Sequence, residues 1–403
     1  MANNHRKAVL LIIDGLGDLP TPKTPLQAAK KPNMDRLAKN GITGMLCTIK
    51  RFLVPGSDVS HLNILGYEPT IFYAGRGPLE ALGVGIQLKE GDVAFRTNFA
   101  TIENGKVTDR RAGRIDTKAA SGLAPLLSMK IDDIQVIFKH SVEHRGALVL
   151  RGKGLSGAVS DTDPHKAGEI HQCVPLDESP GAQKTADIVN KFTKLAIERL
   201  STAPENTKLE TQNRKPANAV LLRGAGCYKP ILSFYERYGL NAACIAGGAL
   251  YRGVARYLGM DVILAQGASG DKDTNLKAKA EAAAKALKNY DFVFLHVKAC
   301  DSAGHDGDFG LKKKMIEKID AIIPLLEKTG ACIVITGDHS TPVSLKAHSG
   351  HEVPILVYRG ERVDEVKKFD EMSCMKGGLG HIRGKDILPL ILNITGRAEK
   401  IGS

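Results

Sequence analysis

The 403-residue sequence predicts an α/β protein with a doubly wound, mostly parallel sheet and an inserted α+β domain. Near both ends of the chain, strand-like apolar runs alternate with helix-like segments, which is typical of a parallel sheet. Between residues 83 and 238 the pattern changes to short alternating stretches separated by polar and basic loops. We therefore expect one sheet domain built from residues 1–82 and 239–403, with residues 83–238 inserted as a second domain.

The N-terminal part begins with the strand-like run AVLLIID (8–14), followed by the loop GLGDLPTPKTPLQ (15–27). The segment PNMDRLAKNG (32–41) predicts a helix, because proline is favoured in a first helical turn and glycine at a helix end. A second apolar run, ITGMLCTI (42–49), predicts the next strand.

In the inserted region, the alternation in FATIENGKVTD predicts a β-hairpin that turns at Asn104-Gly105. Residues 176–218 look like a helix and loop segment. After the insertion, strands are expected at 241–247, 261–267, 291–297, 331–338 and 353–358, with helices over 249–259, 276–289 and 311–328.

Composition indicates an ordinary globular protein, with 43% hydrophobic and 25% charged residues. The longest apolar runs are far shorter than the roughly 20 residues of a membrane helix, and the segment MANNHRK has no apolar signal core. Seven scattered cysteines without a CxxC pair favour reduced, buried thiols over disulfides or a thiolate zinc site. We expect a cytoplasmic protein without a membrane partner.

The net charge of +12 makes nucleic acid a partner to consider. However, the aromatic content is only 5%, tryptophan is absent, and the lysines of the 311–328 segment are interpreted as a solvated helix face. We therefore expect no nucleic-acid partner. A positive field would instead help to recruit a small anionic substrate. The oligomeric state stays open.

The stretch PGSDVSHLNILGYEP (55–69) places a serine at the start of a predicted helix. One interpretation is that Ser57 or Asp58 is the N-cap, since both residue types accept hydrogen bonds from free backbone amides there. The other is that Ser57 is a nucleophile, because a helix N-terminus favours an incoming phosphate. The choice depends on what the rest of the chain supplies.

Acidic residues stand at the ends of three predicted strands, where ligands bind in open parallel sheets. Asp14 and Asp338 end their strands, and Asp301 lies a few residues beyond the strand at 291–297. Carboxylates and imidazoles at one sheet edge suit zinc or manganese, and without thiolates the site would be catalytic.

Histidines accompany these carboxylates. His305 follows Asp301 by four residues, His339 follows Asp338 directly, and His348 and His351 lie in the loop AHSGHE. Two bound metals would lower the pKa of the Ser57 hydroxyl and hold the phosphoryl oxygens, so no separate base beside the serine is needed.

Together, the motifs IIDGLGD, PGSDVSHLNILGYEP, HVKACDSAGHDGD and TGDHSTPVSLKAHSGHEVPI resemble the archaeal-type, 2,3-bisphosphoglycerate-independent phosphoglycerate mutases of the alkaline phosphatase superfamily. The resemblance covers nearly the whole chain. It implies an alkaline phosphatase type of sheet domain, an inserted substrate-binding domain, and two divalent ions (Mn²⁺, Zn²⁺, Co²⁺ or Mg²⁺) between them. One ion would be held by Asp301, His305 and His348, and the other by Asp14, Ser57, Asp338 and His339.

The resemblance further implies interconversion of 3-phosphoglycerate and 2-phosphoglycerate in glycolysis and gluconeogenesis. Ser57 would take the phosphoryl group, the glycerate would turn over in place, and no 2,3-bisphosphoglycerate would be needed. His348 matches the family ligand because a serine follows it, while His351 stands where an aspartate is expected, and its role stays open.

The inserted domain should bind a carboxylate and a phosphate, which guanidinium groups do by bidentate hydrogen bonds. Asp161 or Asp163 could carry the glycerate proton, and His165 could cap or pack. The expected substrate-binding residues are Arg111, Arg114, His144, Arg145 and Arg223, with Arg252 in the ALYRG segment as a further candidate.

Three related enzymes and one other class are alternatives. A phosphomonoesterase or a phosphopentomutase would use the same metal motifs, whereas a sulfatase lacks support because no CxPxR-type context surrounds Ser57. A basic RNA-binding protein would explain the net charge. It would not explain the acidic and histidine residues at the strand ends.

Overall fold

The computed structural model describes residues 5–19, 23–360, 362–400 and 402. The chain divides into two compact units, the first formed by Met1–Tyr73 and Leu232–Ser403 and the second by Ala74–Ile231. The sequence-based boundaries, at 82/83 and 238/239, lie nine and seven residues further along the chain. Residues 1–4, and residues 20–22 of the expected loop at 15–27, lie outside the described part.

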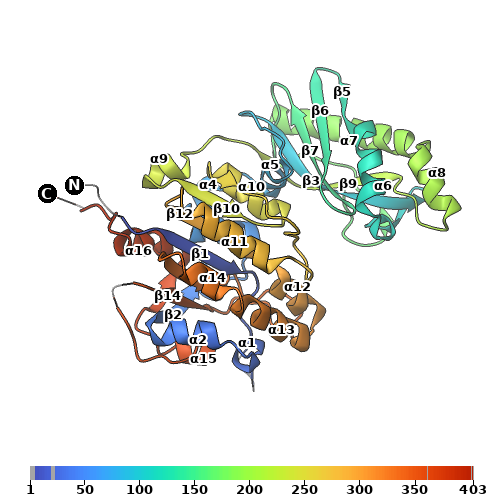
Figure 1. Cartoon of the computed structure of the whole chain (residues 1–403). Coiled ribbons are helices and arrows are strands. Elements are labelled where there is room, and N and C mark those ends of the chain that lie inside the picture. The colour runs from blue at the N-terminus through green and yellow to red at the C-terminus, as the bar shows by residue number, and fades with distance from the viewer. Residues whose placement is uncertain (1–4, 20–22, 361, 401, 403) are drawn as a thin grey trace. The chain divides into compact units, whose positions relative to one another are not determined.

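The first unit contains a mixed sheet of eight strands in the order β11-β10-β12-β1-β13-β14-β2-β15 (Figure 1). Most neighbours are parallel, but β14 runs antiparallel to both β13 and β2. The predicted fold class is therefore confirmed. The strands are β1 (Ala8–Ile13), β2 (Gly41–Cys47), β10 (Ala242–Ile245), β11 (Asp261–Val262), β12 (Phe292–Val297), β13 (Cys332–Thr336), β14 (Val353–Tyr358) and β15 (Gly380–Arg383).

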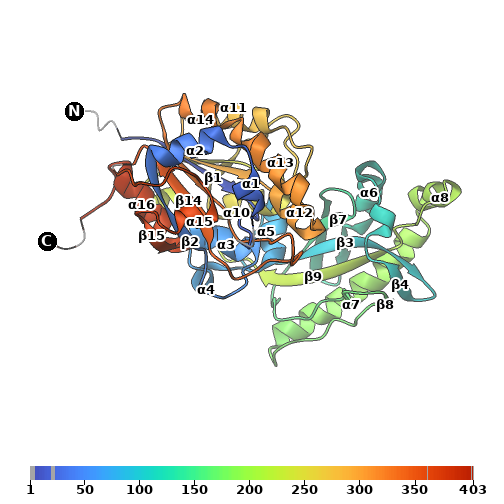
Figure 2. The ribbon, with the colours of Figure 1, turned by 90° about the horizontal axis from the view of Figure 1, so that it is seen from below.

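Helices cover both faces of this sheet (Figure 2). Successive side chains of a strand point to opposite faces, so β12 can pack against helices on both sides. On one face, Val293, Leu295 and Val297 belong to the core that also contains side chains of α2, α11, α13 and α14. The other residues of β12 point to an aromatic cluster with side chains of α3, α9 and α10. The helices of this unit are α1 (Pro25–Ala28), α2 (Pro32–Lys39), α3 (Ser57–Ile64), α4 (Pro69–Phe72), α9 (Phe234–Tyr238), α10 (Ala249–Tyr257), α11 (Leu276–Ala286), α12 (Ala299–Asp306), α13 (Phe309–Asp320), α14 (Ile323–Glu327), α15 (Glu371–Cys374) and α16 (Ile387–Ile394).

Two predicted elements differ in the structure. The helix expected over 311–328 is divided into α13 and α14, and Pro324, which cannot donate a backbone hydrogen bond, stands in the first turn of α14. The strand expected at 261–267 is reduced to Asp261–Val262, because only its first residues pair with β10 at the edge of the sheet.

The interpretation of the 311–328 lysines as a solvated face is wrong for Lys312. Its side chain is 0% exposed, and its ammonium group donates three hydrogen bonds inside the protein. Lys313, the next residue, is partly exposed and pairs with Glu317. The sequence places three lysines in a row, and the rotation of the helix decides which of them points inward.

The second unit is an antiparallel sheet in the order β5-β6-β7-β3-β4-β8, with β9 paired to the other edge of β3. The predicted hairpin is confirmed, since β3 and β4 pair around Asn104-Gly105. The strands are β3 (Val93–Glu103), β4 (Lys106–Asp109), β5 (Met129–Ile131), β6 (Ile134–His140), β7 (Arg145–Arg151), β8 (Gly168–Glu169) and β9 (Ala219–Cys227).

Helices also cover this second sheet. α7 packs its apolar side on one face through residues such as Val189 and Phe192, and it lies along β9 (Figure 2). On the other face, Ala81 of α5 packs against Ala94 and Ala147. The helices of this unit are α5 (Arg76–Gly83), α6 (Thr117–Leu123), α7 (Pro180–Ser201) and α8 (Pro204–Thr211), and short 3₁₀ turns lie at Ala112–Arg114, Ala124–Leu127 and, in the first unit, Gly384–Asp386.

Other bulk features follow from the same structure. All seven cysteines are free thiols, and only Cys227 is not fully buried. In the described part of the chain, every helix is too short or too polar to span a bilayer.

Candidate active site

Three buried carboxylates meet at the carboxyl edge of the first sheet. Asp14 directly follows β1, Asp338 follows β13, and Asp301 lies in the first turn of α12, which follows β12. β1 is paired with both β12 and β13 in parallel, so the three strand ends lie next to one another. The side chains of all three residues are almost completely buried.

Two groups of side chains at this edge could each hold a cation. Asp14, Asp338 and His339 form one group, and Asp301, His339 and His348 form the other, with the ligand atoms of each group within 4.8 Å of one another. His339 therefore belongs to both groups, whereas the family resemblance assigned it to one. His305 lies beside the second group, with Nε2 3.4 Å from Asp301 Oδ1.

The donor atoms fit a divalent cation. Asp14 Oδ1 and Asp338 Oδ2 are buried and accept no hydrogen bond from any described residue. A buried carboxylate oxygen without a partner is costly, and a cation between these oxygens would remove that cost. His339 Nε2 lies 3.2 Å from Asp338 Oδ2 and 3.6 Å from Asp14 Oδ1, close to the same position.

The histidine rings are oriented by hydrogen bonds at their other nitrogens. His348 Nδ1 donates to the carbonyl of Pro55 at 2.9 Å, and His305 Nδ1 donates to the carbonyl of Lys346 at 3.0 Å. Because a carbonyl can only accept, both Nε2 atoms remain available as metal ligands. The two Nε2 atoms lie 3.3 Å (His348) and 3.4 Å (His305) from Asp301 Oδ1.

Ser57 is the first residue of α3, and its hydroxyl does not cap the helix. The N-cap is Gly56, so the interpretation of Ser57 or Asp58 as the N-cap is wrong, although Asp58 Oδ1 accepts a hydrogen bond from the amide of Val59 at 3.0 Å. Ser57 Oγ instead lies 3.0 Å from His339 Nε2 and is 6% exposed. The hydroxyl is thus adjacent to both candidate cation groups.

Several residues that the sequence analysis missed surround Asp14. Its Oδ2 accepts one hydrogen bond from the hydroxyl of Tyr251, on α10, and another from His296 of β12 at 3.1 Å. Burial raises the pKa of Tyr251 well above its ordinary value, as does the charge of Asp14, so the phenol remains a donor. Burial lowers the pKa of His296 to about 4.

Lys298 is a further missed residue, and it connects the two candidate groups. Its ammonium donates to Asp301 Oδ2 at 2.7 Å and lies 3.5 Å from Asp14 Oδ2. Burial lowers its pKa, but Asp14, Tyr251 and Asp301 outweigh that effect and raise the pKa well above the usual value. The lysine follows β12 directly, as Asp14 follows β1, so its place at a strand end was the available signal.

Asp301 and Asp338 favour the charged form. Burial raises the pKa of Asp301, but the neighbouring His305 and His348 and the charge of Lys298 bring it well below the usual range. Burial likewise raises the pKa of Asp338, and the neighbouring His339 lowers it by more. Ionised carboxylates are the form that binds a metal.

Three predicted residues of the second unit, Asp161, Asp163 and Arg223, lie at or near a partly buried ion pair. Arg110, which the sequence analysis did not select, donates two hydrogen bonds of 2.7 Å to Asp163, and Arg223 Nε lies 3.7 Å from the same carboxylate. Burial raises the pKa of Asp163, and the hydrogen bonds from Arg110 outweigh that effect and lower it. Asp161 accepts from the backbone amide of Gly224 at 2.8 Å.

Arginines gather near this pair. Arg96 lies opposite Arg223 on paired strands, and burial lowers the pKa of Arg96 to about 9, with Arg76, Arg223 and Arg145 adding to the shift. Like charges directly opposite one another destabilise a sheet, and an anion bound between them would offset that repulsion. The signal for Arg96 was a charged residue inside the alternating strand VAFRTNFATIE.

The remaining predicted residues differ in burial. His144 is buried, and burial together with the charges of Arg145 and Arg111 lowers its pKa to about 3. Arg111, Arg114 and Arg145 are exposed. The exposed ring of His165 lies 3.4 Å from Asp161.

Two further predicted residues belong to the first unit. Arg252 lies on α10, next to Tyr251. The His351 ring is hydrogen-bonded to Ser349 Oγ at 3.0 Å and belongs to neither candidate cation group among the described residues.

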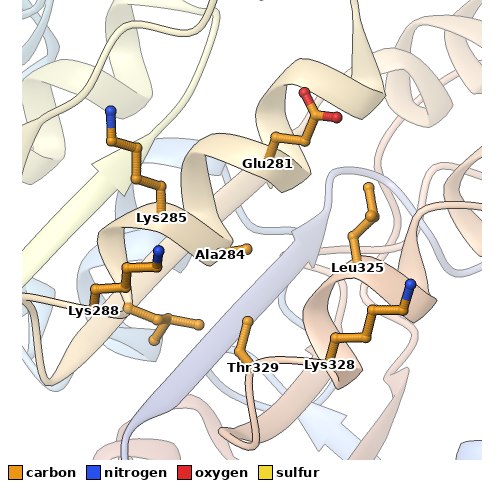
Figure 3. A pocket seen from close by; sticks show the side chains of 8 residues that line it. Glu281, Ala284, Lys285, Lys288, Leu325, Lys328 and Thr329 are labelled. Atoms are coloured by element: carbon orange, nitrogen blue, oxygen red, sulfur yellow. The ribbon is translucent and has the colours of Figure 1, made fainter.

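A pocket of about 600 Å³ lies elsewhere on the first unit, between α11 and α14 (Figure 3). Lys285, Lys288 and Lys328 line it together with Leu325 and Thr329. α11 leads into the start of β12, so this pocket lies at the amino end of the strands, whereas the candidate site is at their carboxyl end. It contains no predicted site residue.

The chain is similar to known proteins over nearly its whole length. The family model of the Metalloenzyme superfamily matches residues 6–394. The chain is 48% identical to the 2,3-bisphosphoglycerate-independent phosphoglycerate mutase 1 of Methanocaldococcus jannaschii, covering 98% of this chain and 99% of that protein. It is 47% identical to the protein of the same name from Archaeoglobus fulgidus, with the same coverage.

Solved structures agree in fold. The PH0037 protein from Pyrococcus horikoshii superimposes with a TM-score of 0.86 at 39% identity, covering 99% of this chain and 100% of that one. The cofactor-independent phosphoglycerate mutase from Thermoplasma acidophilum superimposes with a TM-score of 0.72 at 36% identity, covering 97% and 100%.

Proposed function

Since the chain belongs to the Metalloenzyme superfamily and, within it, to the 2,3-bisphosphoglycerate-independent phosphoglycerate mutases, we propose that it interconverts 3-phosphoglycerate and 2-phosphoglycerate through a phosphoserine. One observation carries the mechanistic part of this proposal. The Ser57 hydroxyl lies 3.0 Å from His339, the residue that the two candidate cation groups share.

The proposed cofactors are two divalent ions. Asp14, Ser57, Asp338 and His339 would hold one, and Asp301, His305 and His348 the other. When bound, such ions lower the pKa of a coordinated hydroxyl and neutralise the charge on phosphoryl oxygens. The free oxygens of Asp14 and Asp338 support this assignment, and Mn²⁺, Zn²⁺, Co²⁺ and Mg²⁺ are the ions to compare.

In the proposed reaction, Ser57 Oγ forms a bond to the substrate phosphorus and the P–O bond to the glycerate breaks. The proton that leaves Ser57 is balanced by the proton taken up by the glycerate oxygen. After the glycerate turns, its other hydroxyl oxygen forms a bond to the phosphorus and the P–O bond to Ser57 Oγ breaks. The proton that leaves this hydroxyl is balanced by the proton that Ser57 Oγ takes up. The atoms balance without 2,3-bisphosphoglycerate. Lys298, placed between Asp14 and Asp301, would add a fixed positive charge to the site.

The second unit would bind the anionic ends of the substrate. Arg96 and Arg223 are partly buried and lie opposite each other, which supports a direct role, while the exposed Arg111, Arg114 and Arg145 would contact the bound anion from the surface. Of the two predicted proton carriers, Asp163 is held as an anion by Arg110, so we propose that Asp161 carries the glycerate proton. His144 would donate from a neutral ring. Arg252, on α10, stays a further candidate for binding an anionic end of the substrate.

Metal reconstitution and a coupled assay test this proposal. Metal-free protein is loaded with each of the four ions, supplied with 3-phosphoglycerate, and coupled to enolase without added 2,3-bisphosphoglycerate. We expect turnover with at least one ion. Release of inorganic phosphate in place of 2-phosphoglycerate would instead identify a phosphomonoesterase. A cytoplasmic location stays part of the proposal.

A further inference from the structure

We infer that Lys312, on α13, is a positioning residue of the metal centre that fastens the two loops carrying its ligands. The inference rests on the proposed function, because it concerns the same metal centre. Lys312 is fully buried, and no sequence motif pointed to it.

The ammonium of Lys312 uses all three of its N–H donors. It donates to the carbonyl of Gly17 at 2.9 Å, to Asp18 Oδ2 at 3.0 Å, and to the carbonyl of Thr341 at 2.9 Å. An ammonium has three donors, so its hydrogen-bonding capacity is complete. The single charge of Asp18 balances it within the protein.

These acceptors come from the loops that follow β1 and β13. Gly17 lies three residues after Asp14, and Thr341 lies two residues after His339. The two loops are also joined directly, since the amide of Thr341 donates to the carbonyl of Gly17 at 3.1 Å. Lys312 thus binds both loops at the point where they meet.

Thr341 transmits this constraint to the ligands. Its hydroxyl donates to Asp301 Oδ1 at 2.9 Å and lies 3.0 Å from His339 Nδ1. Its carbonyl packs tightly against α12, since a Cβ atom on Gly304 would lie only 2.4 Å from it. Fixing Thr341 therefore fixes the carboxylate of Asp301 and the imidazole of His339. Both belong to the candidate cation group that also contains His348.

If Lys312 had only a structural role, it would affect the stability of the protein as one charge of a buried ion pair and would not affect metal affinity. Removing one partner of a buried pair leaves the other charge uncompensated, whereas removing both can restore stability. The double variant Lys312→Met/Asp18→Asn separates the two roles, because it removes both charges and also removes the hydrogen bonds to Gly17 and Thr341.

The test measures Mn²⁺ affinity by titration of metal-free protein, with thermal melts of the same samples. We expect Lys312→Met and the double variant to bind Mn²⁺ about tenfold or more weakly, and the double variant to recover the melting temperature without the affinity. Lys313→Met, a matched change at a partly exposed position of the same helix, should leave both unchanged. If the single variant does not fold, the double variant carries the comparison.

A second cycle tests transmission through Thr341. If Lys312 acts through Thr341, the effects of Lys312→Met and Thr341→Val on Mn²⁺ affinity should be strongly non-additive. A folded double variant with wild-type Mn²⁺ affinity would overturn the inference and leave the proposed function intact. Failure of the wild-type protein to bind Mn²⁺ or any other tested divalent ion would overturn the proposed metal centre and this inference together.

Discussion

Replacing Ser57 with alanine should abolish turnover while barely changing stability. The Ser57 side chain does not cap α3, and within the described part of the chain its hydroxyl hydrogen-bonds only to His339 Nε2. Loss of one such bond costs about 0.5–1.5 kcal/mol, and the higher helix propensity of alanine offsets a few tenths of that amount. We therefore expect a melting temperature lower by about 2–4 °C or less.

The expected effect on the reaction is far larger. Removing a covalent nucleophile lowers kcat on the order of 10⁴- to 10⁶-fold, which corresponds to about 5–8 kcal/mol of transition-state stabilisation. The stability change therefore cannot account for the activity change. Ser60→Ala is the matched control, because Ser60 is buried in the same helix and, among the residues that the structure describes, its hydroxyl donates only to Thr48 Oγ1, at 3.4 Å. This variant should retain activity.

The decisive assay follows the phosphate. Brief incubation of the wild-type protein with ³²P-labelled 3-phosphoglycerate, followed by acid quenching, should leave label on a peptide that contains Ser57. Free labelled glycerate added during turnover should not enter the product. Label on another residue would refute the nucleophile, and rapid incorporation of free glycerate would refute the intramolecular route.

Three other outcomes are expected. Asp301→Asn should lower metal occupancy, measured by elemental analysis, and abolish turnover. Asp306→Asn, at an exposed position of the same helix, should change neither. Wild-type metal occupancy in Asp301→Asn would show that Asp301 is not a ligand. Arg223→Gln should weaken 3-phosphoglycerate binding, measured by calorimetry, by about 1.5–3 kcal/mol. Arg214→Gln, at an exposed ion pair, should leave the affinity unchanged. If Arg223→Gln binds 3-phosphoglycerate as tightly as the wild type, Arg223 has only a structural role. Burial lowers the pKa of His144 from 6.5 to about 3, so as the pH falls the unfolded chain takes up this proton before the folded protein does. The folded protein therefore loses stability below pH 6.5, by about 2 kcal/mol at pH 5. His144→Gln should remove that part of the pH dependence in urea melts, and an unchanged slope would contradict the assignment.

The strand-end carboxylates could be predicted because they depend on order along the chain. Alternating strands and helices place Asp14, Asp301 and Asp338 at one edge of a parallel sheet wherever the helices pack. Lys298 also stands at a strand end, so its place at this edge was open to the same prediction. The contacts of Lys298 and Tyr251 with Asp14 were not, because they depend on side-chain directions at the end of β12 and on α10.

The errors have physical causes as well. The apolar pattern of 311–328 continues through Pro324, so it did not reveal the break between α13 and α14. The charge of Lys312 suggested solvent, but three acceptors inside the protein compensate its burial. For Ser57, the residue type suited a cap, yet the glycine before it takes that position, and only the structure shows which residue begins the helix.

The position of β1 in the middle of the first sheet affects how the protein is made. β1 is synthesised first, but it pairs with β12 and β13, which begin roughly 280 and 320 residues later. At about 5–20 residues per second, the wait is roughly 15 to 65 seconds. The second unit is continuous in sequence and can complete its own sheet during this time. We therefore expect the apolar segment AVLLII to need protection by chaperones on the ribosome until Cys332–Thr336 has emerged.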